Sequence, residues 1–244
     1  MKSKFFNIFF YTLLLIHTCI YFVLLFFYLI PHMVFKNRKH NLFRLRYSIR
    51  LYGYLMLKIA VFPFVKIKYK DFSDYPSKNG IYICNHRSSS DPFLMTLLNC
   101  DMVQVVSKWP FKIPVLGYFA KKAEYISVLD MTQEKFDQEA MRILDQNISI
   151  AAFPEGTRSG CKKMNHFTSI VFRTALKVKC PLFPVCITGN ENIPTKDFTM
   201  HTGTIKMHKL SPVLWEEYKN MSAFQLKNYL KNIMASEISK MEEE

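Results

Sequence analysis

Acidic residues are missing from the first part of the chain: residues 1–70 contain no aspartate and no glutamate. The same residues contain twelve lysines and arginines, which account for most of the formal net charge of +14. A basic excess of this kind is typical of proteins that bind nucleic acid or an anionic membrane surface. The longest apolar run of the chain lies in the same segment, and no nucleic-acid-binding motif is present. We therefore expect a phospholipid membrane, and no nucleic acid, among the partners.

Cysteine patterns for metal binding are missing as well. The six cysteines include no C-x-x-C pair, and no spacing of cysteine and histidine resembles a zinc site. Cys84, Cys180 and Cys186 lie in apolar stretches, where a free cysteine packs as a small hydrophobic residue. We expect reduced thiols in a reducing compartment.

Charged side chains are absent from residues 5–30 apart from His17, which ionises near neutral pH. As a helix rising about 1.5 Å per residue, this run exceeds the ~30 Å hydrocarbon thickness of a bilayer. A cleaved signal peptide would have an apolar core of about 7–15 residues ending in small residues, whereas this run ends in Leu29-Ile30-Pro31. Because Pro31 marks a break, the run is either one full span or the first helix of a membrane-embedded hairpin.

Basic residues follow the apolar run directly, and they are Lys36, Arg38, Lys39, Arg44, Arg46 and Arg50. By the positive-inside tendency, this collar and the chain after it stay on the cytoplasmic face of the membrane. Residues 42–65 mix basic with apolar and aromatic side chains, which suits an interfacial helix with its basic groups on lipid phosphates. An amphipathic helix packed on the soluble part fits the same pattern, and both can hold. We assign residues 1–64 to a membrane anchor and basic interfacial segment.

Residues 65–244 have the pattern of one α/β domain. Short strands are predicted at 65–72, 81–84, 102–108, 149–154, 181–188 and 202–210. Helices are predicted at 92–98, 114–122, 132–146 and 166–179, followed by a C-terminal surface helix with a frayed acidic end. Because strands alternate with helices, we expect a mostly parallel sheet flanked by helices. No internal repeat, low-complexity tract or long linker divides this part of the sequence.

The stretch NHRSSSD, residues 85–91, follows the predicted strand 81–84. His86 then lies at the carboxyl end of a strand and Asp91 at the start of a helix, on the edge where open α/β sheets bind ligands. A tight turn would let the carboxylate hold one imidazole nitrogen and leave the other as a general base. That base would act on an external hydroxyl, because no G-x-S-x-G nucleophile elbow is present. On spacing alone, a helix-capping aspartate beside a loop histidine is the commoner case.

The stretch FPEGTRS, residues 153–159, follows another predicted strand. Arg158 offers a planar fork of donors that suits a phosphate. Close backbone approach and hydroxyl donors would come from Gly156, Thr157 and Ser159. The alternative is a turn held by an ion pair between Glu155 and Arg158, which for this stretch alone is the commoner case.

Taken together, the two stretches resemble motifs of the glycerolipid acyltransferase family, which contains the 1-acylglycerol-3-phosphate acyltransferases. The first motif of that family, N-H-x-x-x-x-D, is matched by Asn85, His86 and Asp91. The third motif, F-P-E-G-T-R-S, is matched at every position of residues 153–159. Either motif alone is a weak signal, whereas the pair is highly specific.

The fourth motif of the family, a short apolar strand around a proline, is similar to PLFPVCITG at residues 181–189, with Pro184 as the key residue. The resemblance covers about residues 65–210. An N-terminal hydrophobic anchor is also usual in that family.

The resemblance implies transfer of a fatty acyl group from acyl-CoA or acyl carrier protein to the free hydroxyl of a lysophospholipid. The first expectation for the acceptor is 1-acylglycerol-3-phosphate, which would give phosphatidic acid. His86 would be the general base and Asp91 its orienting partner. The phosphate and glycerol of the acceptor would lie against Glu155, Gly156, Thr157, Arg158 and Ser159. The resemblance implies no metal and no prosthetic group.

The chain departs from the family pattern at two places. The second motif usually ends in an arginine, whereas this sequence has Asp130-Met131 there. The F-K-K-G that often follows the third motif is replaced by Phe167-Thr168-Ser169-Ile170. The nearby lysines are Lys108, Lys112, Lys121 and Lys122. We take Lys108 as the candidate replacement for the arginine, although each of the four also fits a solvated surface.

Both departures remove basic groups near the expected headgroup site, so two alternatives stay open. One is an acyltransferase for a different lysolipid or an amino-acid-derived lipid. The other is a non-catalytic membrane adaptor that keeps the fold, for which the pair of His86 and Asp91 has no use.

Overall fold

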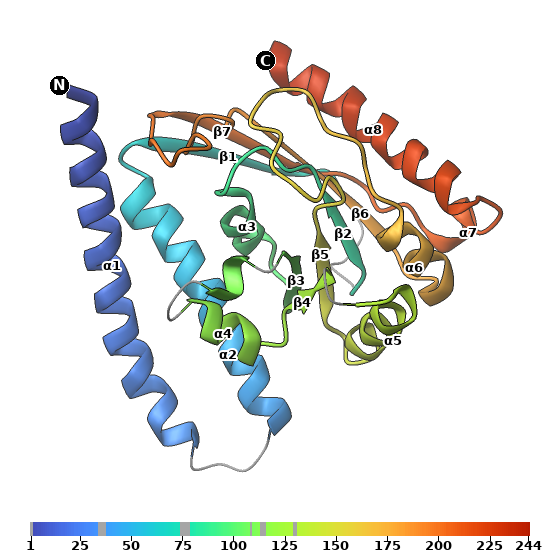
Figure 1. Ribbon diagram of the computed structural model, residues 1–244, viewed down its shortest axis with the longest axis horizontal. Coiled ribbons are helices and arrows are strands. Elements are labelled where there is room, and N and C mark those ends of the chain that lie inside the picture. Colours follow the sequence, from blue (N-terminus) through green and yellow to red (C-terminus); the bar gives the residue numbers. More distant parts are fainter. Residues whose placement is uncertain (1, 34–37, 74–78, 108, 113–115, 129–130) are drawn as a thin grey trace.

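The computed structural model describes residues 2–33, 38–73, 79–107, 109–112, 116–128 and 131–244 (Figure 1). Two helices come first and run antiparallel, α1 (Lys2–Met33) and α2 (Arg38–Leu55). A π-helical segment, η1 (Met56–Val61), continues α2. The break that was expected at Pro31 falls just after it, because α1 includes Pro31 in its last turn and ends at Met33. Pro31 has no N–H to donate and cannot easily be followed by further helical turns.

A single seven-stranded sheet follows, in the order β1-β7-β6-β2-β5-β3-β4. Its strands are β1 (Val65–Asp71), β2 (Ile81–Cys84), β3 (Met102–Val106), β4 (Ile126–Ser127), β5 (Ser149–Ala152), β6 (Leu182–Thr188) and β7 (Gly203–Lys209). Neighbouring strands pair in parallel except β6 and β7. The predicted α/β class with a mostly parallel sheet flanked by helices is therefore confirmed.

The helices of the sheet region are α3 (Asp91–Leu94), η2 (Met95–Leu97), η3 (Trp109–Lys112), α4 (Leu116–Lys122), α5 (Gln133–Leu144), α6 (Ile170–Val178), α7 (Trp215–Tyr218) and α8 (Ala223–Glu243). The two-residue strand β4 and the single-turn helix α7 are too short to leave a periodic signal and were not predicted. Helix α6 begins four residues later than expected, because the Thr168 N–H bonds the carbonyl of Pro154 at 2.7 Å and holds the preceding segment over the FPEGTRS turn.

Both faces of the sheet are buried. In β2, Ile81 and Ile83 belong to the core shared with α5, α6 and α8, whereas Tyr82 and Cys84 belong to the core on the opposite face. Because successive side chains of a strand point to opposite faces, the unbroken apolar run IYIC fits a strand covered on both sides. Helices α1 to α3 and η1 cover the second face (Figure 1).

Helix α2 is fastened to the α/β domain by a bidentate ion pair. Arg46 Nε and Nη2 lie 2.7 and 2.8 Å from the two carboxylate oxygens of Asp101. Buried residues of the following turns, including Met56, Leu57 and Ala60, extend the contact. This helix is therefore packed on the domain, which was one of the two predicted arrangements, and Arg46 is not available to lipid phosphates.

Candidate active site

The candidate site forms where β6, β2 and β5 lie side by side in the sheet. These strands are parallel, so their carboxyl ends reach the same edge. His86 follows β2, Phe153 follows β5 and Asn190 follows β6. The crevice outside the carboxyl ends of parallel strands is the usual ligand site of open α/β sheets. Three loops that are distant in the sequence therefore meet around His86.

The predicted dyad is formed. His86 Nδ1 and Asp91 Oδ2 lie 2.7 Å apart, with the imidazole partly exposed and the carboxylate fully buried. With its proton on Nδ1, His86 donates to the carboxylate and leaves Nε2 unprotonated, as a general base requires. The Phe153 ring lies against the imidazole, with the ring centroids 4.7 Å apart.

The Asp91 carboxylate is itself held in place. Its Oδ2 accepts the backbone N–H groups of Arg87 at 2.7 Å and Ser88 at 2.8 Å, and its Oδ1 accepts a short hydrogen bond from the Asn190 side chain. Asn190 was missed from the sequence. The signal that identified His86, a polar residue just after the carboxyl end of a buried strand, applies equally to Asn190.

Glu155 does not pair with Arg158, so the ion-pair interpretation of FPEGTRS is wrong. One carboxylate oxygen of Glu155 accepts the backbone N–H of His86 and the other accepts that of Asn165, both at 2.7 Å. Burial raises the pKa of this carboxyl above its usual range, and the two backbone donors offset part of the rise. Glu155 therefore connects the loop after β5 to the loop after β2, with both oxygens occupied by the protein itself.

Arg158 keeps unused donors. Its Nη1 is buried without a hydrogen-bond partner, and its guanidinium carbon lies 5.3 Å from the centre of the Phe198 ring. Among the described residues it makes no ion pair. A guanidinium held by a ring and left with free N–H groups is suited to bind an anion that enters from outside.

A groove of 1690 Å³ opens beside the dyad. Polar groups of its wall come from His86 and from Gly156, Thr157 and Arg158 of the FPEGTRS turn. Apolar side chains from α1 and η1, including Phe10, Leu14, Phe22, Met56 and Leu57, line the rest. The other two predicted binding residues of the FPEGTRS turn, Glu155 and Ser159, do not line it. The Ser159 N–H bonds the His86 carbonyl at 2.8 Å instead.

Comparisons with known proteins bear on this arrangement. A model of the acyltransferase family matches residues 66–188, about half of the chain. The chain belongs to the acyltransferase family. Similar proteins include the 1-acyl-sn-glycerol-3-phosphate acyltransferase of Limnanthes alba, at 31% identity over 57% of this chain, and that of Escherichia coli K12, at 24% identity over 86% of it.

The alignments cover unequal shares of these relatives. This chain spans 51% of the Limnanthes alba protein, about half of its length, and 84% of the Escherichia coli protein. Among solved structures, the 1-acyl-sn-glycerophosphate acyltransferase PlsC of Thermotoga maritima superposes with a TM-score of 0.80 over 98% of both chains, at 19% identity. That similarity shows the fold.

The loop that carries the dyad is also bound to α8, the last helix described. Arg87 is 1% exposed, and its Nη1 lies 3.2 Å from Glu191 and 2.5 Å from Glu242 on α8. Burial opposes ionisation of Glu242, but hydrogen bonds from Lys162 and Arg87 outweigh it and lower the pKa of its carboxyl. The expected frayed acidic end is therefore wrong, since α8 stays helical to Glu243 and holds the dyad loop.

The candidate replacements for the missing second-motif arginine that fall in the described part of the chain do not line the groove. Lys108 and Asp130 lie outside the described residues, so the predicted binding role of Lys108 remains a prediction. Lys112, Lys121 and Lys122 are exposed and do not line the groove. Within the described residues, no three histidine, cysteine, aspartate or glutamate side chains gather as they would around a metal ion.

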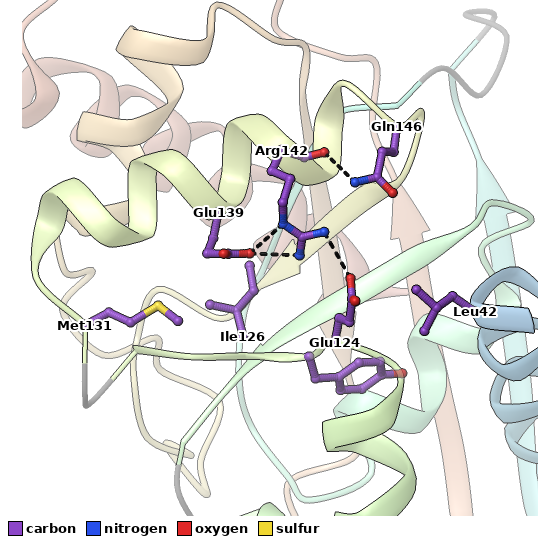
Figure 2. A pocket seen from close by; sticks show the side chains of 8 residues that line it. Leu42, Glu124, Ile126, Met131, Glu139, Arg142 and Gln146 are labelled. Carbon is purple, nitrogen blue, oxygen red and sulfur yellow. Dashed lines mark hydrogen bonds and ion pairs between the residues drawn. The ribbon is translucent and has the colours of Figure 1, made fainter. Parts of the chain in front are cut away.

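A second cavity of 710 Å³ is lined by residues of α5, of the segment that follows α4, and by Leu42 of α2 (Figure 2). The charged side chains in its wall form ion pairs with one another. Arg142 lies 2.8 Å from Glu139 and 3.0 Å from Glu124 (Figure 2). Because the arginine already has carboxylate partners and His86 is not in the wall, this cavity is not the site of the dyad's chemistry.

Proposed function

We propose that this protein is a membrane-bound O-acyltransferase that esterifies a lysophospholipid with an acyl group from acyl-CoA or acyl carrier protein, with 1-acylglycerol-3-phosphate as the first acceptor. The observation that carries the proposal is the formed dyad at the end of a large, mostly apolar groove. The names of the relatives support the acceptor. A membrane adaptor would need neither the hydrogen bond between His86 and Asp91 nor its support by Asn190.

The reaction follows from the geometry. The acceptor hydroxyl gives its proton to His86 Nε2 as its oxygen bonds to the thioester carbonyl carbon. The Asp91 carboxylate stabilises the imidazolium that forms. When the carbon–sulfur bond breaks, the imidazolium returns the proton to the departing thiolate. The products are an ester and a free thiol, and His86 ends as it began.

The groove has a polar part and an apolar part, and each would bind a different part of the substrates. Arg158 and the backbone at Gly156 would hold the acceptor phosphate, whereas the apolar wall from α1 and η1 would hold acyl chains. Glu155 and Ser159 would not contact the substrates. Their hydrogen bonds to His86 hold the loop after β5 against the loop after β2.

The acceptor is tested with purified full-length protein, labelled acyl-CoA and a panel of lysophosphatidic acid, lysophosphatidylcholine, lysophosphatidylethanolamine and lysophosphatidylglycerol. We expect lysophosphatidic acid to give the highest kcat/KM, because a phosphomonoester brings close to two negative charges to Arg158. A higher kcat/KM for a zwitterionic lysolipid would support the second acceptor class, and no turnover with any acceptor would support the adaptor.

Arg158→Lys should raise the KM for lysophosphatidic acid about tenfold and leave the KM for acyl-CoA unchanged. A lysine keeps the charge but loses the planar fork and the stacking on Phe198. The matched control is Arg173→Lys, at an exposed position of α6. Equal changes in both KM values would instead make Arg158 a structural residue of the turn.

Membrane attachment is proposed from exposed apolar side chains. Residues 4–28 of α1 are long and apolar enough to cross a membrane, yet only 17% of the most apolar window is buried. Exposed residues of α1 include Phe5, Phe9, Ile16, Ile20, Val23 and Phe27. Such a surface is far larger than soluble proteins usually leave uncovered.

The arrangement of α1 favours embedding from one side over a full span. Near its N-terminus, Asn7 pairs with the backbone of Met200 and the Tyr11 hydroxyl donates to the Phe198 carbonyl at 2.5 Å. Further along, the Tyr21 hydroxyl donates to the Ser48 carbonyl on α2. Because α1 lies along the domain and α2, we propose a hairpin in one leaflet, with the domain on the cytoplasmic face.

The full-length protein should stay with membranes in 1 M salt and leave them only in detergent, because apolar burial is not screened by ions. Introducing charge on the exposed face, as Ile16→Asp with Ile20→Asp, should convert it to a salt-extractable protein. The control is Phe224→Asp with Tyr229→Asp on α8, two exposed apolar residues outside the hairpin. Extraction of the unaltered protein by salt alone would refute the embedding of α1.

A further inference from the structure

The segment of residues 190–200, between β6 and β7, is hydrogen-bonded to the loop that carries the dyad and is here called the Lys196 loop. It is tied to the catalytic loop at its start. Asn190 bonds Asp91, and the Ser88 hydroxyl lies 3.1 Å from the Ile193 carbonyl and 2.8 Å from that of Pro194. The beginning of the loop is therefore fixed by the same loop that carries His86.

The rest of the loop is held by its own turn and by α1. The Thr195 N–H bonds the Thr199 carbonyl at 3.0 Å, and the Thr199 N–H returns to the Thr195 hydroxyl at 3.0 Å. The Asp197 carboxylate accepts from both threonine hydroxyls. The contacts of α1 to Phe198 and Met200 hold the far end of the loop.

The Lys196 loop and the FPEGTRS turn interlock. A Cβ built on Gly160 would lie 2.3 Å from Cε of Lys196, so the lysine stem lies in the space that the glycine leaves. The second contact is made by the Arg158 guanidinium of the turn, which lies over the Phe198 ring of the loop. Lys196 and Arg158 therefore come from two different loops and enter the same wall of the groove, where both line it with His86.

The cationic side chains that line the groove differ in whether they already have a partner. Among them, Arg46 is paired with Asp101, and Arg50 donates to Asn99 at 2.7 Å. Lys196 is the one lysine among the described lining residues, and within the described part of the chain it makes no hydrogen bond or ion pair. The adjacent Asp197 does not line the groove and is occupied by the two threonines.

We propose that Lys196 supplies the second cation for the acceptor phosphate and so takes the part of the arginine missing from the second motif. The inference rests on the proposed function for its substrate. A phosphomonoester carries about −1.5 to −2 charges near neutral pH, and one guanidinium neutralises only part of that. The lysine ammonium and the arginine fork would contact the phosphate from two directions. This proposal assigns specificity for a phosphomonoester to a loop outside the four motifs.

The test compares Lys196→Met, which keeps the apolar stem, with Lys196→Arg and with the matched control Lys163→Met. Lys163 is exposed, lies close in sequence to the FPEGTRS turn and does not line the groove. Steady-state KM values are measured for lysophosphatidic acid and lysophosphatidylcholine at two salt concentrations. Binding of lysophosphatidic acid is measured separately by calorimetry in the His86→Ala background, in detergent micelles.

Lys196→Met should raise the KM and the Kd for lysophosphatidic acid about tenfold, the lower end of the range for hydrogen bonds to charged groups, because the ammonium is exposed. It should also weaken the salt dependence of both constants, whereas Lys196→Arg and Lys163→Met should behave like the unaltered protein. The KM for lysophosphatidylcholine should change little, since a phosphodiester carries one charge less.

Two outcomes would overturn the proposal: an unchanged Kd for lysophosphatidic acid in Lys196→Met, or an equal loss for lysophosphatidylcholine. The binding arm does not depend on turnover. If the unaltered protein binds lysophosphatidic acid but transfers no acyl group, the proposed function fails while the role of Lys196 is still decided by the Kd values.

Discussion

His86→Ala is expected to abolish measurable acyl transfer, a loss of at least about 10³-fold in kcat, in a protein that remains folded. The substitution removes the imidazole that is proposed to accept the hydroxyl proton, and general-base catalysis typically contributes 10²–10⁴-fold. Because the imidazole is partly exposed and its backbone N–H still bonds Glu155, the loop keeps its main anchor. Turnover is measured with labelled acyl-CoA and the best acceptor of the panel.

The control for this prediction is His201→Ala, an exposed histidine outside the groove, together with the thermal unfolding midpoint of each variant. Near-normal turnover of a folded His86→Ala protein would exclude the proposed mechanism. If His86→Ala lost turnover and its thermal unfolding midpoint also dropped strongly, binding of lysophosphatidic acid would show whether the variant is folded. A folded variant retains this binding.

Asp91→Asn is expected to lower kcat by roughly 10²–10⁴-fold while KM values change little, because the carboxylate acts on the base and not on the substrate. In the structure, an amide at this position can make hydrogen bonds in place of those of the carboxylate. The new amide oxygen can face the donors of His86, Arg87 and Ser88, as the carboxylate does. Its NH₂ group then faces Asn190, whose own side-chain oxygen is buried without a partner and can accept after the amide turns over.

The matched control is Asp145→Asn, an exposed aspartate at the end of α5. Asn190→Ala is a milder variant of the same test. It removes the hydrogen bond from Asn190 to the Asp91 carboxylate and should lower kcat less than Asp91→Asn does. If Asp91→Asn and Asp145→Asn have the same kcat, Asp91 only holds the backbone of the loop before α3, and the dyad interpretation is wrong.

The parts of the site that could be predicted are those fixed by local chain geometry. His86 and Asp91 are five positions apart, and a strand followed by a turn and a helix brings such neighbours together regardless of the rest of the fold. The predicted face of α5, with Phe136, Ala140 and Ile143, is buried for the same reason, since a 3.6-residue period is a local property.

The roles within FPEGTRS could not be predicted from its composition. Glu155 and Arg158 are three residues apart and of opposite charge, so an ion pair was a reasonable alternative. The carboxylate of Glu155 is taken by two backbone N–H groups instead, that of His86 in the neighbouring loop and that of Asn165 further along its own segment, and buried N–H groups need an acceptor. Arg158 was thereby left with free donors facing the groove.

By itself, the sequence determined the α/β class, the apolar N-terminal segment and the dyad, because periodicity, charge distribution and short spacings are local and additive along the chain. Only the tertiary structure decided which loops share the site. The order β6-β2-β5 brings Asn190 to Asp91 across 99 residues of sequence, and Glu242 reaches Arg87 from the end of α8. Strands buried on both faces carry no alternation that could specify their neighbours, and contacts between distant segments are chosen by the packing of the whole sheet.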